Sequence, residues 1–325
     1  MKVAAVIINY RTPEMTADAV DALLVELAVF DSGDSGGSAS HLFVVDNDSQ
    51  DGSIEALEQA SIRRGWGDRA TVIAAPRNGG YGYGINVAIA RARERTSEPP
   101  EYFYVLNSDA KASPGALAKM VAYMELNSDV GLVGSEIRAM DGTTQGAAFR
   151  FPSFYSEFES NAEVGVISSV LRKHVVSIPT PEESCTVDWL PGTSMLIRWA
   201  TIESVGLFDE GFFLYFEEVD YCRRVSARGW RCCFVADAPI MHVGAASTGL
   251  LDNTRRMPRY WFESRHRYFL KHHGLRYAIA SDVAWLAGYA VSSVRARLTD
   301  AETERRPHFV RDFIASTARD LVLRP

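Results

Sequence analysis

A chain of 325 residues, 47% hydrophobic and 23% charged, is long enough to fold as one large domain or two smaller ones with a sizeable core. Its net charge of −7 argues against general nucleic-acid binding, which requires a basic face. The four cysteines lack metal-ligand spacing; they are Cys185, Cys222, Cys232 and Cys233. We expect them to be reduced and mostly buried, as in a cytosolic protein.

The hydrophobic runs predict neither a signal peptide nor a membrane-spanning helix. Residues 1–9 begin as a strand, with Lys2 as their only basic residue and no cleavage site behind them. The most apolar long stretch, residues 278–294, is interrupted by Asp282 and several serines. It falls short of the roughly 18 uninterrupted apolar residues that span a bilayer. We therefore predict a location in the cytoplasm or at the inner face of the plasma membrane.

Strand and helix patterns alternate through the first part of the chain. Apolar runs rich in branched and aromatic residues predict strands at residues 3–9, 41–45, 70–75 and 102–106. Helical spacing predicts helices at residues 15–30, 53–64, 84–95 and 114–126. This alternation predicts an α/β fold, with a parallel sheet and helices on both faces.

The pattern becomes less regular after Gly131. Further strands are predicted at residues 187–198 and 231–235, and the chain is mostly helical and basic from Arg259 onward. We place a domain boundary near Met257. The expected organisation is a domain over residues 1–257, with a nucleotide part at about 1–110 and an acceptor part at about 111–257, followed by a helical appendage over residues 258–325.

Polar clusters follow all four early strands. They lie at residues 9–12, 46–52, 77–84 and 107–109. Each could be ordinary turn chemistry, since Asn, Asp and Gly are the usual turn residues. Four clusters on one edge of a sheet are harder to explain in that way, because ligands of open α/β sheets bind beyond the carboxyl ends of the strands.

These clusters offer groups that a nucleotide needs. Asp46 could accept a hydrogen bond from a base N–H group, and Tyr10 could stack on the ring. The glycine-rich turn at residues 78–84 lets backbone approach a phosphate or sugar, with a helix N-terminus behind it. Its spacing matches neither the dinucleotide motif nor the Walker P-loop.

A divalent cation would suit the fourth cluster. Asn107 and Asp109 are two residues apart at a strand end and can project toward one point with oxygen ligands. The alternative for Asp109 is an N-cap of the helix near Pro114. His242 also follows a strand, where a lone histidine is more often structural than a ligand. Ser247 and Thr248, close behind it, favour a phosphate-contacting turn.

Three carboxylates stand directly behind five bulky apolar residues at positions 212–216. Glu217, Glu218 and Asp220 also open a helical pattern, whose N-terminus favours anions. A carboxylate in a partly dry pocket can act as a general base. The alternative is a surface helix with an acidic start and a basic end. Residues 189–194 open a strand and predict either a pocket wall or simple packing.

Taken together, these motifs resemble the inverting, GT-A-fold glycosyltransferases of family 2, especially their bacterial rhamnosyltransferase-like branch. The resemblance covers roughly residues 3–274. The motifs that carry it are Val-Ile-Ile-Asn-Tyr at 6–10, Val-Asp-Asn-Asp-Ser at 45–49, Gly-Tyr-Gly at 80–82 after Asn78, Leu-Asn-Ser-Asp at 106–109, Gly-Thr-Ser-Met-Leu-Ile-Arg at 192–198, Phe-Glu-Glu-Val-Asp-Tyr-Cys-Arg-Arg at 216–224, and His242. It implies a mixed, mostly parallel sheet with a C-terminal helical appendage.

The resemblance implies a role for each motif. The donor nucleotide would contact Tyr10, Thr12, Asp46, Asn78, Gly80, Asn86, Asn107 and Ser108. Mg²⁺ or Mn²⁺ would be held by Asp109 and His242, the acceptor pocket would include Trp189, Gly192 and Thr193, and the catalytic group would be Glu218, Glu217 and Asp220. The chain departs from the family at two positions. Asn107 replaces an aspartate of the metal motif, and Glu218 stands where aspartate is usual, which leaves the choice of base between Glu217 and Glu218 open.

The expected function is inverting transfer of a sugar, such as rhamnose, from a nucleotide-diphosphate sugar to a hydroxyl of a glycan or lipid-linked glycan. The rival interpretations are a catalytically silent sugar-binding or scaffold relative and a sugar-nucleotidyltransferase, which would need a basic glycine-rich loop after the first strand. In the C-terminal segment, aromatic residues alternate with arginine and lysine around Trp261 and Tyr268. This pattern predicts contact with a membrane surface or partner. A plain helical cap or a homodimer contact is the alternative.

Overall fold

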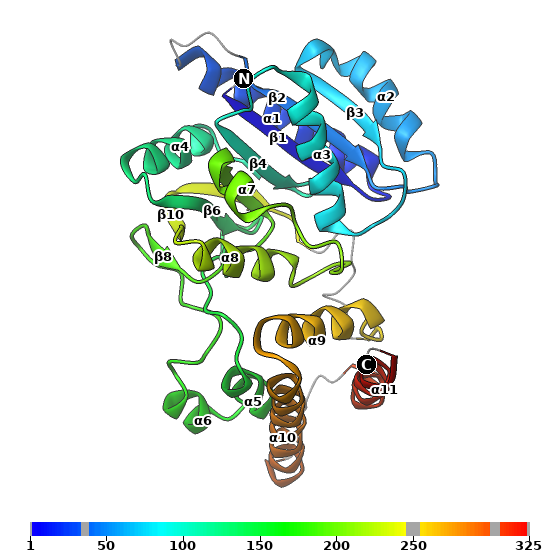
Figure 1. Cartoon of the computed structure of the whole chain (residues 1–325), viewed down its shortest axis with the longest axis vertical. Coiled ribbons are helices and arrows are strands. Elements are labelled where there is room, and N and C mark those ends of the chain that lie inside the picture. Colours follow the sequence, from blue (N-terminus) through cyan, green and yellow to red (C-terminus); the bar gives the residue numbers. More distant parts are fainter. Residues whose placement is uncertain (1, 34–38, 245–253, 300–305, 324–325) are drawn as a thin grey trace. The chain divides into compact units, whose positions relative to one another are not determined.

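The computed structural model describes residues 2–33, 39–244, 254–299 and 306–323, which form two compact units (Figure 1). The first unit comprises Met1–Phe149, Pro179–Phe213 and Glu217–Ser247. The second comprises Arg150–Ile178, Leu214–Phe216 and Thr248–Pro325. The C-terminal helices therefore share a unit with two earlier segments, which the sequence pattern did not indicate.

A ten-stranded sheet forms the centre of the first unit. Eight strands follow the order β3-β2-β1-β4-β9-β6-β10-β5, while β7 pairs with β6 and β8 with β10. The strands are β1 (Val3–Asn9), β2 (His41–Asp46), β3 (Ala70–Ala74), β4 (Tyr102–Asn107), β5 (Ala110–Ala112), β6 (Val130–Arg138), β7 (Thr144–Gln145), β8 (Cys185–Val187), β9 (Ser194–Arg198) and β10 (Arg231–His242). Strands β1 to β4 are parallel, as are β6 and β10, whereas β9 runs antiparallel between β4 and β6. The predicted mixed, mostly parallel sheet is confirmed.

Helices cover both faces of this sheet. They are α1 (Pro13–Gly33), α2 (Ser53–Arg64), the 3-10 turn η1 (Gly67–Arg69), α3 (Tyr81–Arg95), α4 (Ala116–Leu126), α7 (Trp199–Val205) and α8 (Glu217–Ala227). Helix α1 packs against α2 and α4, and α8 packs against α3 and α7, which lie in front of the sheet in Figure 1. Strands β1 and β2 are buried along their whole length, which explains their uninterrupted apolar sequences.

The strand register brings the predicted polar clusters to one edge of the sheet. Asn9 pairs with Asp46 across β1 and β2. Ile8 pairs with Asn107 across β1 and β4. Because these strands are parallel, their carboxyl ends meet at the same edge, as the sequence predicted.

Several boundaries differ from the sequence prediction. The single strand predicted at residues 187–198 is two strands, β8 and β9, since Pro191 and Gly192 break the run between them. Helix α3 begins at Tyr81 instead of Gly84, directly after Gly80 with its positive φ of 91°. Strand β10 continues to His242 instead of ending at Val235. Strand β6 was not predicted.

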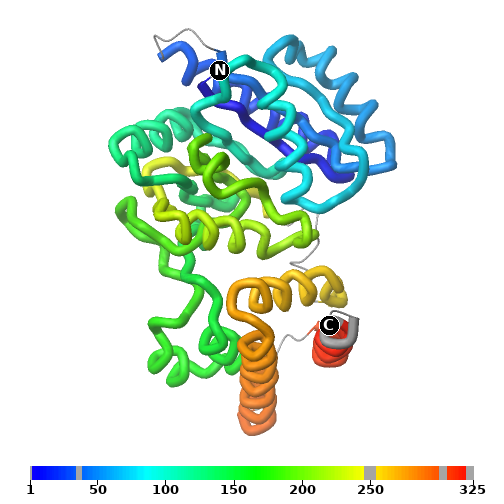
Figure 2. Tube along the Cα trace, viewed as in Figure 1, coloured from blue at the N-terminus to red at the C-terminus, as the bar shows by residue number. Residues whose placement is uncertain are grey.

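The second unit is helical. Its helices are α5 (Phe154–Ala162), α6 (Gly165–Val170), α9 (Arg259–His273), α10 (Leu275–Thr299) and α11 (Phe309–Leu323). Helices α5 and α10 lie side by side although they are far apart in the sequence (Figure 2). Gly288 permits this close approach, because a Cβ atom there would lie 2.4 Å from the backbone oxygen of Phe158.

A buried arginine connects three helices of the second unit. The Arg265 Nε donates to Glu157 at 2.7 Å and its Nη1 donates to Asp282 at 2.5 Å. Nearby, Phe262, Trp285 and Phe313 form an apolar cluster that joins α9, α10 and α11. The network and the cluster together explain how helices with little apolar periodicity pack together.

In the first unit, a buried carboxylate holds the start of α4. Glu26 of α1 is 4% exposed and accepts hydrogen bonds from the backbone N–H groups of Gly115 and Leu117, both at 2.9 Å. These are two of the N–H groups that a helix leaves without an internal partner.

We predict that Glu26→Gln lowers the free energy of unfolding by about 1–3 kcal/mol, because an amide offers one acceptor where two donors point. Urea denaturation measures the loss. Glu58→Gln, at an exposed position of α2, is the matched control and should change little. Equal effects of the two substitutions would contradict the capping role of Glu26.

Candidate functional site

The first part of the candidate site is a hydrogen-bonded group at the ends of β1 and β2. Asp46, 3% exposed, accepts from the Asn9 amide at 2.6 Å and from the Ser49 hydroxyl at 2.6 Å. Thr12, beside this group, has a buried hydroxyl without a hydrogen-bond partner. Tyr10 is only partly buried. Asp46, Tyr10 and Thr12 thus lie at one edge, and their contacts with a nucleotide remain predictions.

Asn47 connects the glycine-rich turn to the end of β2. Its amide nitrogen donates to Asn78 Oδ1 at 3.1 Å and to the Gly80 carbonyl at 3.0 Å. The Asn78 oxygen also accepts from the Gly80 N–H group at 3.2 Å. The hydrogen bond between Asn78 and Gly80 therefore stabilises the conformation of this turn.

Gly80 touches the chain just before α8. A Cβ atom at this position would lie 1.8 Å from the Phe213 carbonyl oxygen, and its φ of +91° is in the region that favours glycine. The next residue, Tyr81, donates its N–H group to the same oxygen at 3.0 Å. Only a residue without a side chain permits this contact.

Asn86 acts within the protein. Its side chain donates to the Phe208 carbonyl at 2.9 Å and accepts from the Phe208 N–H group at 2.9 Å. Asn86 is 5% exposed. Its contact with the donor stays a prediction; in the structure its side chain holds the loop ahead of α8 against α3.

The side chain of Tyr81 reaches the second part of the site. Its hydroxyl lies 2.6 Å from Asn107 Oδ1 and 3.0 Å from the Gly192 carbonyl. A single hydroxyl proton cannot serve both acceptors fully. If the Asn107 side-chain amide is rotated by about 180°, its nitrogen donates to the Tyr81 oxygen and the Tyr81 hydroxyl donates to the Gly192 carbonyl. Asn107, Tyr81 and Gly192 are then all hydrogen-bonded. Burial and the charges of Glu217, Asp109 and Glu218 raise the pKa of Tyr81.

Asp109 and His242 lie next to each other, as predicted. The distance from His242 Nε2 to Asp109 Oδ1 is 3.2 Å, and His242 Nδ1 lies 3.1 Å from Gln145 Oε1. Asp109 does not cap the following helix, since strand β5 intervenes and Glu26 binds the start of α4. Ser247 and Thr248 lie outside the described residues.

The residues at this point can contribute two ligands to a cation. Among the described residues, no three side chains of His, Cys, Asp or Glu converge as a metal-binding group. Mg²⁺ is typically bound through one or two carboxylates, with substrate phosphates and water completing the shell. Asp109, with His242 beside it, fits a site of that kind. The described residues do not form a complete set of protein ligands around a cation.

The acidic pair at the start of α8 is buried and poorly satisfied. Glu217 is 3% exposed, and within the described part of the chain the Oε2 atoms of both Glu217 and Glu218 are buried without a hydrogen-bond partner. Burial raises the pKa of Glu218 to about 7, although N–H groups at the helix start act in the opposite direction. Burial, and then the charge of Glu218, raises the pKa of Glu217 well above its ordinary value.

Two strained residues precede this pair. Tyr215 and Phe216 both have a φ of 67°, which is rare for bulky residues. Such strain persists where the surrounding structure enforces it, often at functional sites.

Asp220 has a different environment from the two glutamates. It is fully buried, and its Oδ2 accepts from Arg224 Nε at 2.9 Å. Arg224 also donates to the carbonyls of Val205 and Leu207. Asp220 thus holds Arg224, which binds the loop before α8; its predicted place in the catalytic group stays a prediction.

The predicted acceptor residues adjoin the glycine-rich turn. The Gly192 carbonyl accepts from Tyr81, and the Thr193 carbonyl accepts from the Asn107 N–H group at 2.9 Å. Trp189 stacks on Phe149 with ring centroids 4.2 Å apart. Ser108 is 6% exposed, between Asn107 and Asp109. Gly192, Thr193 and Ser108 therefore lie with the motif at the end of β4, whereas Trp189 packs on Phe149.

Family models match most of the chain. The model of Glycosyl transferase family 2 matches residues 4–171, and that of Glycosyl transferase family group 2 matches residues 102–316. The chain belongs to glycosyl transferase family 2. The predicted family is thereby confirmed.

Two curated proteins are similar to this family 2 chain. The N-acetylglucosaminyl-diphospho-decaprenol L-rhamnosyltransferase of Mycobacterium tuberculosis is 29% identical over 209 residues, which cover 61% of this chain and 66% of that protein. Rhamnosyltransferase WbbL of Escherichia coli is 27% identical over 146 residues, which cover 44% of this chain and 52% of that protein. Part of each relative, at least a third of its length, therefore lies outside the match.

Solved structures have the same fold. Mannosyltransferase PcManGT from Pyrobaculum calidifontis, in complex with GDP-Man and Mn²⁺, has a TM-score of 0.57 and 14% identity over 100% of this chain and 88% of its own. GalNAc-T7 with UDP, GalNAc and Mn²⁺ has a TM-score of 0.56 and 12% identity over 100% of this chain and 58% of its own. At these identities the likeness establishes the fold alone, which agrees with the predicted GT-A architecture of the family.

Asn47 and Tyr81 were missed as site residues. Both lie inside the motifs that carry the family resemblance, between residues that were chosen. Asn47 follows Asp46, and Tyr81 opens α3 three residues before the predicted helix start. A correct start of that helix would have placed the tyrosine at the site, since first-turn residues face the sheet edge.

We predict that Gly80→Ala disrupts the site, because the added methyl group must displace the Phe213 backbone and with it the Tyr81 hydroxyl. Thermal unfolding should shift to lower temperature, and turnover of a nucleotide-sugar should fall.

The matched control is Gly229→Ala, where φ is +84° and no atom lies within 4 Å of the new Cβ. It carries only the strain of a left-handed alanine, about 1 kcal/mol. If the two substitutions have the same effect on unfolding and turnover, the contact with Phe213 is unimportant.

Proposed function

We propose that this family 2 protein is an inverting glycosyltransferase that moves a sugar from a nucleotide-diphosphate sugar to a hydroxyl group of a glycan. The observation that carries the proposal is the buried acidic pair, Glu217 and Glu218, with oxygen atoms that lack partners. Unsatisfied buried carboxylates are costly, and no group among the described residues hydrogen-bonds to the Oε2 atom of either glutamate. A substrate hydroxyl is the donor that this arrangement accepts.

We further propose that the sugar is rhamnose and that the acceptor is lipid-linked. Support for rhamnose comes from the names of both curated relatives, which are rhamnosyltransferases. Support for a lipid-linked acceptor comes from the M. tuberculosis relative, whose name specifies a diphospho-decaprenol acceptor. The donor nucleotide would bind at the strand ends, against Tyr10, Asp46 and the turn at Asn78 and Gly80.

In this mechanism Glu218 accepts the proton of the acceptor hydroxyl, since its pKa of about 7 leaves much of it ionised at neutral pH. The acceptor oxygen forms a bond to the anomeric carbon as the bond from that carbon to the diphosphate oxygen breaks. The nucleoside diphosphate leaves with the bonding electrons, and the configuration at the sugar inverts. Glu217, with its raised pKa, keeps its proton and reduces the repulsion that an ionised pair would have.

In this proposal the diphosphate leaves next to Asp109 and His242, which lie 3.2 Å apart. A divalent cation held there would neutralise the charge that develops on the departing diphosphate. Tyr81 positions Asn107 and the Gly192 carbonyl through its hydroxyl. Holding donor and acceptor in line in this way supplies much of the rate of a direct displacement.

We predict that Glu218→Gln lowers kcat by about 10²- to 10⁴-fold while nucleotide binding stays near the wild-type level, because only the proton acceptor is removed. Release of nucleoside diphosphate from a nucleotide-diphosphate rhamnose in the presence of acceptor measures the rate. The wild-type rate should rise with pH to a plateau above about 7, as Glu218 loses its proton.

Glu217→Gln is the matched variant and should retain more activity, because an amide resembles a protonated acid. A greater loss from Glu217→Gln would move the base to Glu217. Donor binding without any transfer in the wild-type protein would favour a catalytically silent relative.

We predict that activity requires Mg²⁺ or Mn²⁺, and that Asp109→Asn raises the metal concentration for half-maximal rate by at least about tenfold. Titration of Mn²⁺ after treatment with a chelator measures this shift. Asp237→Asn, at an exposed position of β10, should leave the titration unchanged. Full activity in excess chelator would contradict metal dependence.

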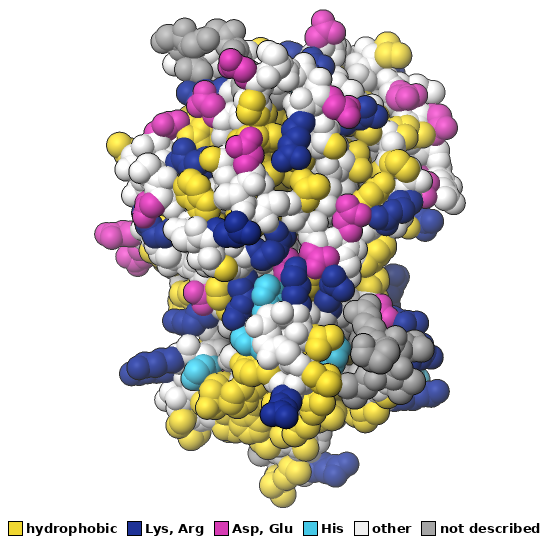
Figure 3. Space-filling model, in the orientation of Figure 1, with side chains coloured by type: hydrophobic (Ala, Val, Ile, Leu, Met, Phe, Trp, Pro, Cys, Tyr) yellow, Lys and Arg dark blue, Asp and Glu magenta, His cyan; other side chains and the backbone are white. Residues whose placement is uncertain are grey.

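We also propose that α10 contacts a membrane surface. No helix among the described residues is long and apolar enough to cross a membrane. Apolar side chains nevertheless gather over α10 on the face seen in Figure 3. Exposed members of this group follow helical spacing: Leu275, Ile279, Val283, Val294 and Leu298. Such a stripe suits a helix that lies in a lipid interface.

We predict that the double variant Val283→Asp and Val294→Asp loses co-sedimentation with anionic lipid vesicles, because a charge on the stripe opposes burial in lipid. Ile62→Asp is the matched control, since Ile62 is an exposed apolar residue of α2. Unchanged sedimentation of the double variant would leave α10 as a packing or dimer surface.

A further inference from the structure

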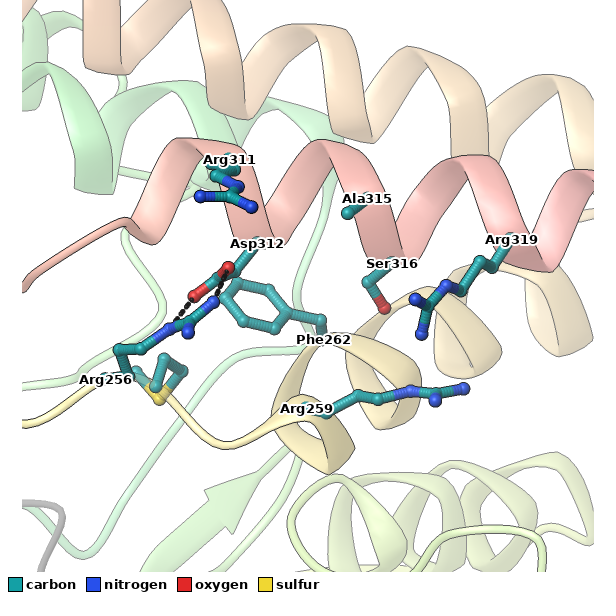
Figure 4. A pocket seen from close by; sticks show the side chains of 9 residues that line it. Arg256, Arg259, Phe262, Arg311, Asp312, Ala315, Ser316 and Arg319 are labelled. Carbon is teal, nitrogen blue, oxygen red and sulfur yellow. Dashed lines mark hydrogen bonds and ion pairs between the residues drawn. The ribbon is translucent and has the colours of Figure 1, made fainter.

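A cavity of about 350 Å³ lies between α9 and α11 of the second unit (Figure 4). Its size is in the range of small-ligand sites. The floor is apolar, with Phe262 of α9 and Met257 just before that helix. This cavity shares no lining residue with the candidate site of the first unit.

The walls of the cavity are strongly cationic. Four arginines line it against a single acidic residue: Arg256, Arg259, Arg311, Arg319 and Asp312. Arg256 pairs with Asp312, whose oxygen lies 2.8 Å from the Arg256 Nε. Arg259 pairs with Glu263, outside the lining. For Arg319 the described residues offer no hydrogen bond or ion pair, so the cavity retains an excess of positive charge.

A buried hydroxyl points into the same space. Ser316 is 7% exposed, and among the described residues its Oγ has no hydrogen-bond partner. In Figure 4 the Ser316 hydroxyl and the Arg319 guanidinium both point toward the cavity. A serine in a helix can usually bond to the carbonyl four residues earlier. A buried hydroxyl that forgoes this bond is free to bond to a group bound in the cavity.

We propose that this cavity binds a phosphate or diphosphate group, with Ser316 and Arg319 as its principal contacts and Arg259 and Arg311 at its rim. Guanidinium groups bind phosphate through paired, charge-assisted hydrogen bonds. Donors that reach the cavity from two helices suit a tetrahedral group with several oxygens better than a planar carboxylate. The apolar floor would contact whatever the phosphate is attached to.

The proposal stands apart from the proposed transfer activity, because binding alone tests it. Titration calorimetry with the full-length protein uses inorganic pyrophosphate in the presence of a chelator, which suppresses metal-dependent binding at Asp109. Arg319→Gln should weaken binding by about tenfold or more, and Ser316→Ala by several-fold. Arg276→Gln, at an exposed position of α10 outside the cavity, is the matched charge control and should have no effect.

Thermal unfolding without ligand separates binding from folding. Ser316→Ala should unfold at the same temperature as the wild type or higher, since an unsatisfied buried hydroxyl is removed. Weaker binding with unimpaired folding supports the site. Equal weakening by Arg319→Gln and Arg276→Gln, or binding that neither pocket variant changes, would overturn it.

The source of the phosphate is distinguished by vesicles. Phosphatidylcholine vesicles with and without phosphatidic acid are sedimented with the protein, and pyrophosphate is added as competitor. Co-sedimentation with the vesicles that depends on phosphatidic acid and on Arg319, and that pyrophosphate abolishes, identifies a lipid phosphate. Pyrophosphate binding without such co-sedimentation identifies a soluble phosphate compound. Failure of both to bind in an Arg319-dependent way contradicts the proposal.

Discussion

The contact between Gly80 and the Phe213 carbonyl is the constraint on which the site depends. It allows the first turn of α3 to lie against the chain that leads into α8, at a distance that any Cβ would prevent. Tyr81 then donates its N–H group to the same carbonyl, and its hydroxyl reaches Asn107 and Gly192. One backbone contact thus brings together segments from four separate parts of the chain.

The electrostatics of the site follow from what this packing leaves unsatisfied. Asp46 and Asp220 are buried too, but each is held by hydrogen bonds or an arginine. Glu217 and Glu218 have no such partner for one oxygen each. Two adjacent carboxyl groups in a dry environment share their titration, so at least one stays protonated near neutral pH.

This arrangement has a cost in stability. The pKa of Glu218 is about 7 in the folded protein against 4.5 for its ordinary value, so the folded state binds more protons between these limits. The contribution of Glu218 to stability is therefore fully present below about pH 4.5 and declines as the pH rises through about 7. A pair that destabilises the protein at working pH is explained more readily by chemistry than by folding.

Most of the sheet could be predicted from the sequence, because β1 to β4 are buried apolar runs and their polar ends lie on one edge. The antiparallel strand β9 and the long strand β6 could not be predicted in place. The strands that they pair with are determined by tertiary contacts, which the sequence does not show. In addition, the sequence around Gly192 resembles a continuous strand, which hides the turn before β9. The sequence also did not predict that residues 150–178 belong to the C-terminal unit, because this depends on the close packing of α5 against α10.

The same limits apply to the site. Asp109 and His242 could be paired from the motifs, whereas the role of Asn86 within the protein could not. Its partner is the backbone of Phe208, more than a hundred residues later, and backbone groups leave no trace in a motif. Asp220 was grouped with the glutamates for a different reason. Its partner Arg224 lies one helical turn later, and such a pair is equally typical of a solvent-exposed helix.

The most direct test of the central claim is a carboxyl titration. Carbon NMR of protein labelled at the glutamate side-chain carboxyl follows each group as the pH changes, without substrate or metal. The account predicts one signal that titrates near pH 7 and disappears in Glu218→Gln, and a second signal, lost in Glu217→Gln, that titrates well above the ordinary glutamate value. Titration of both carboxyls near 4.5, the ordinary value for glutamate, would contradict the account.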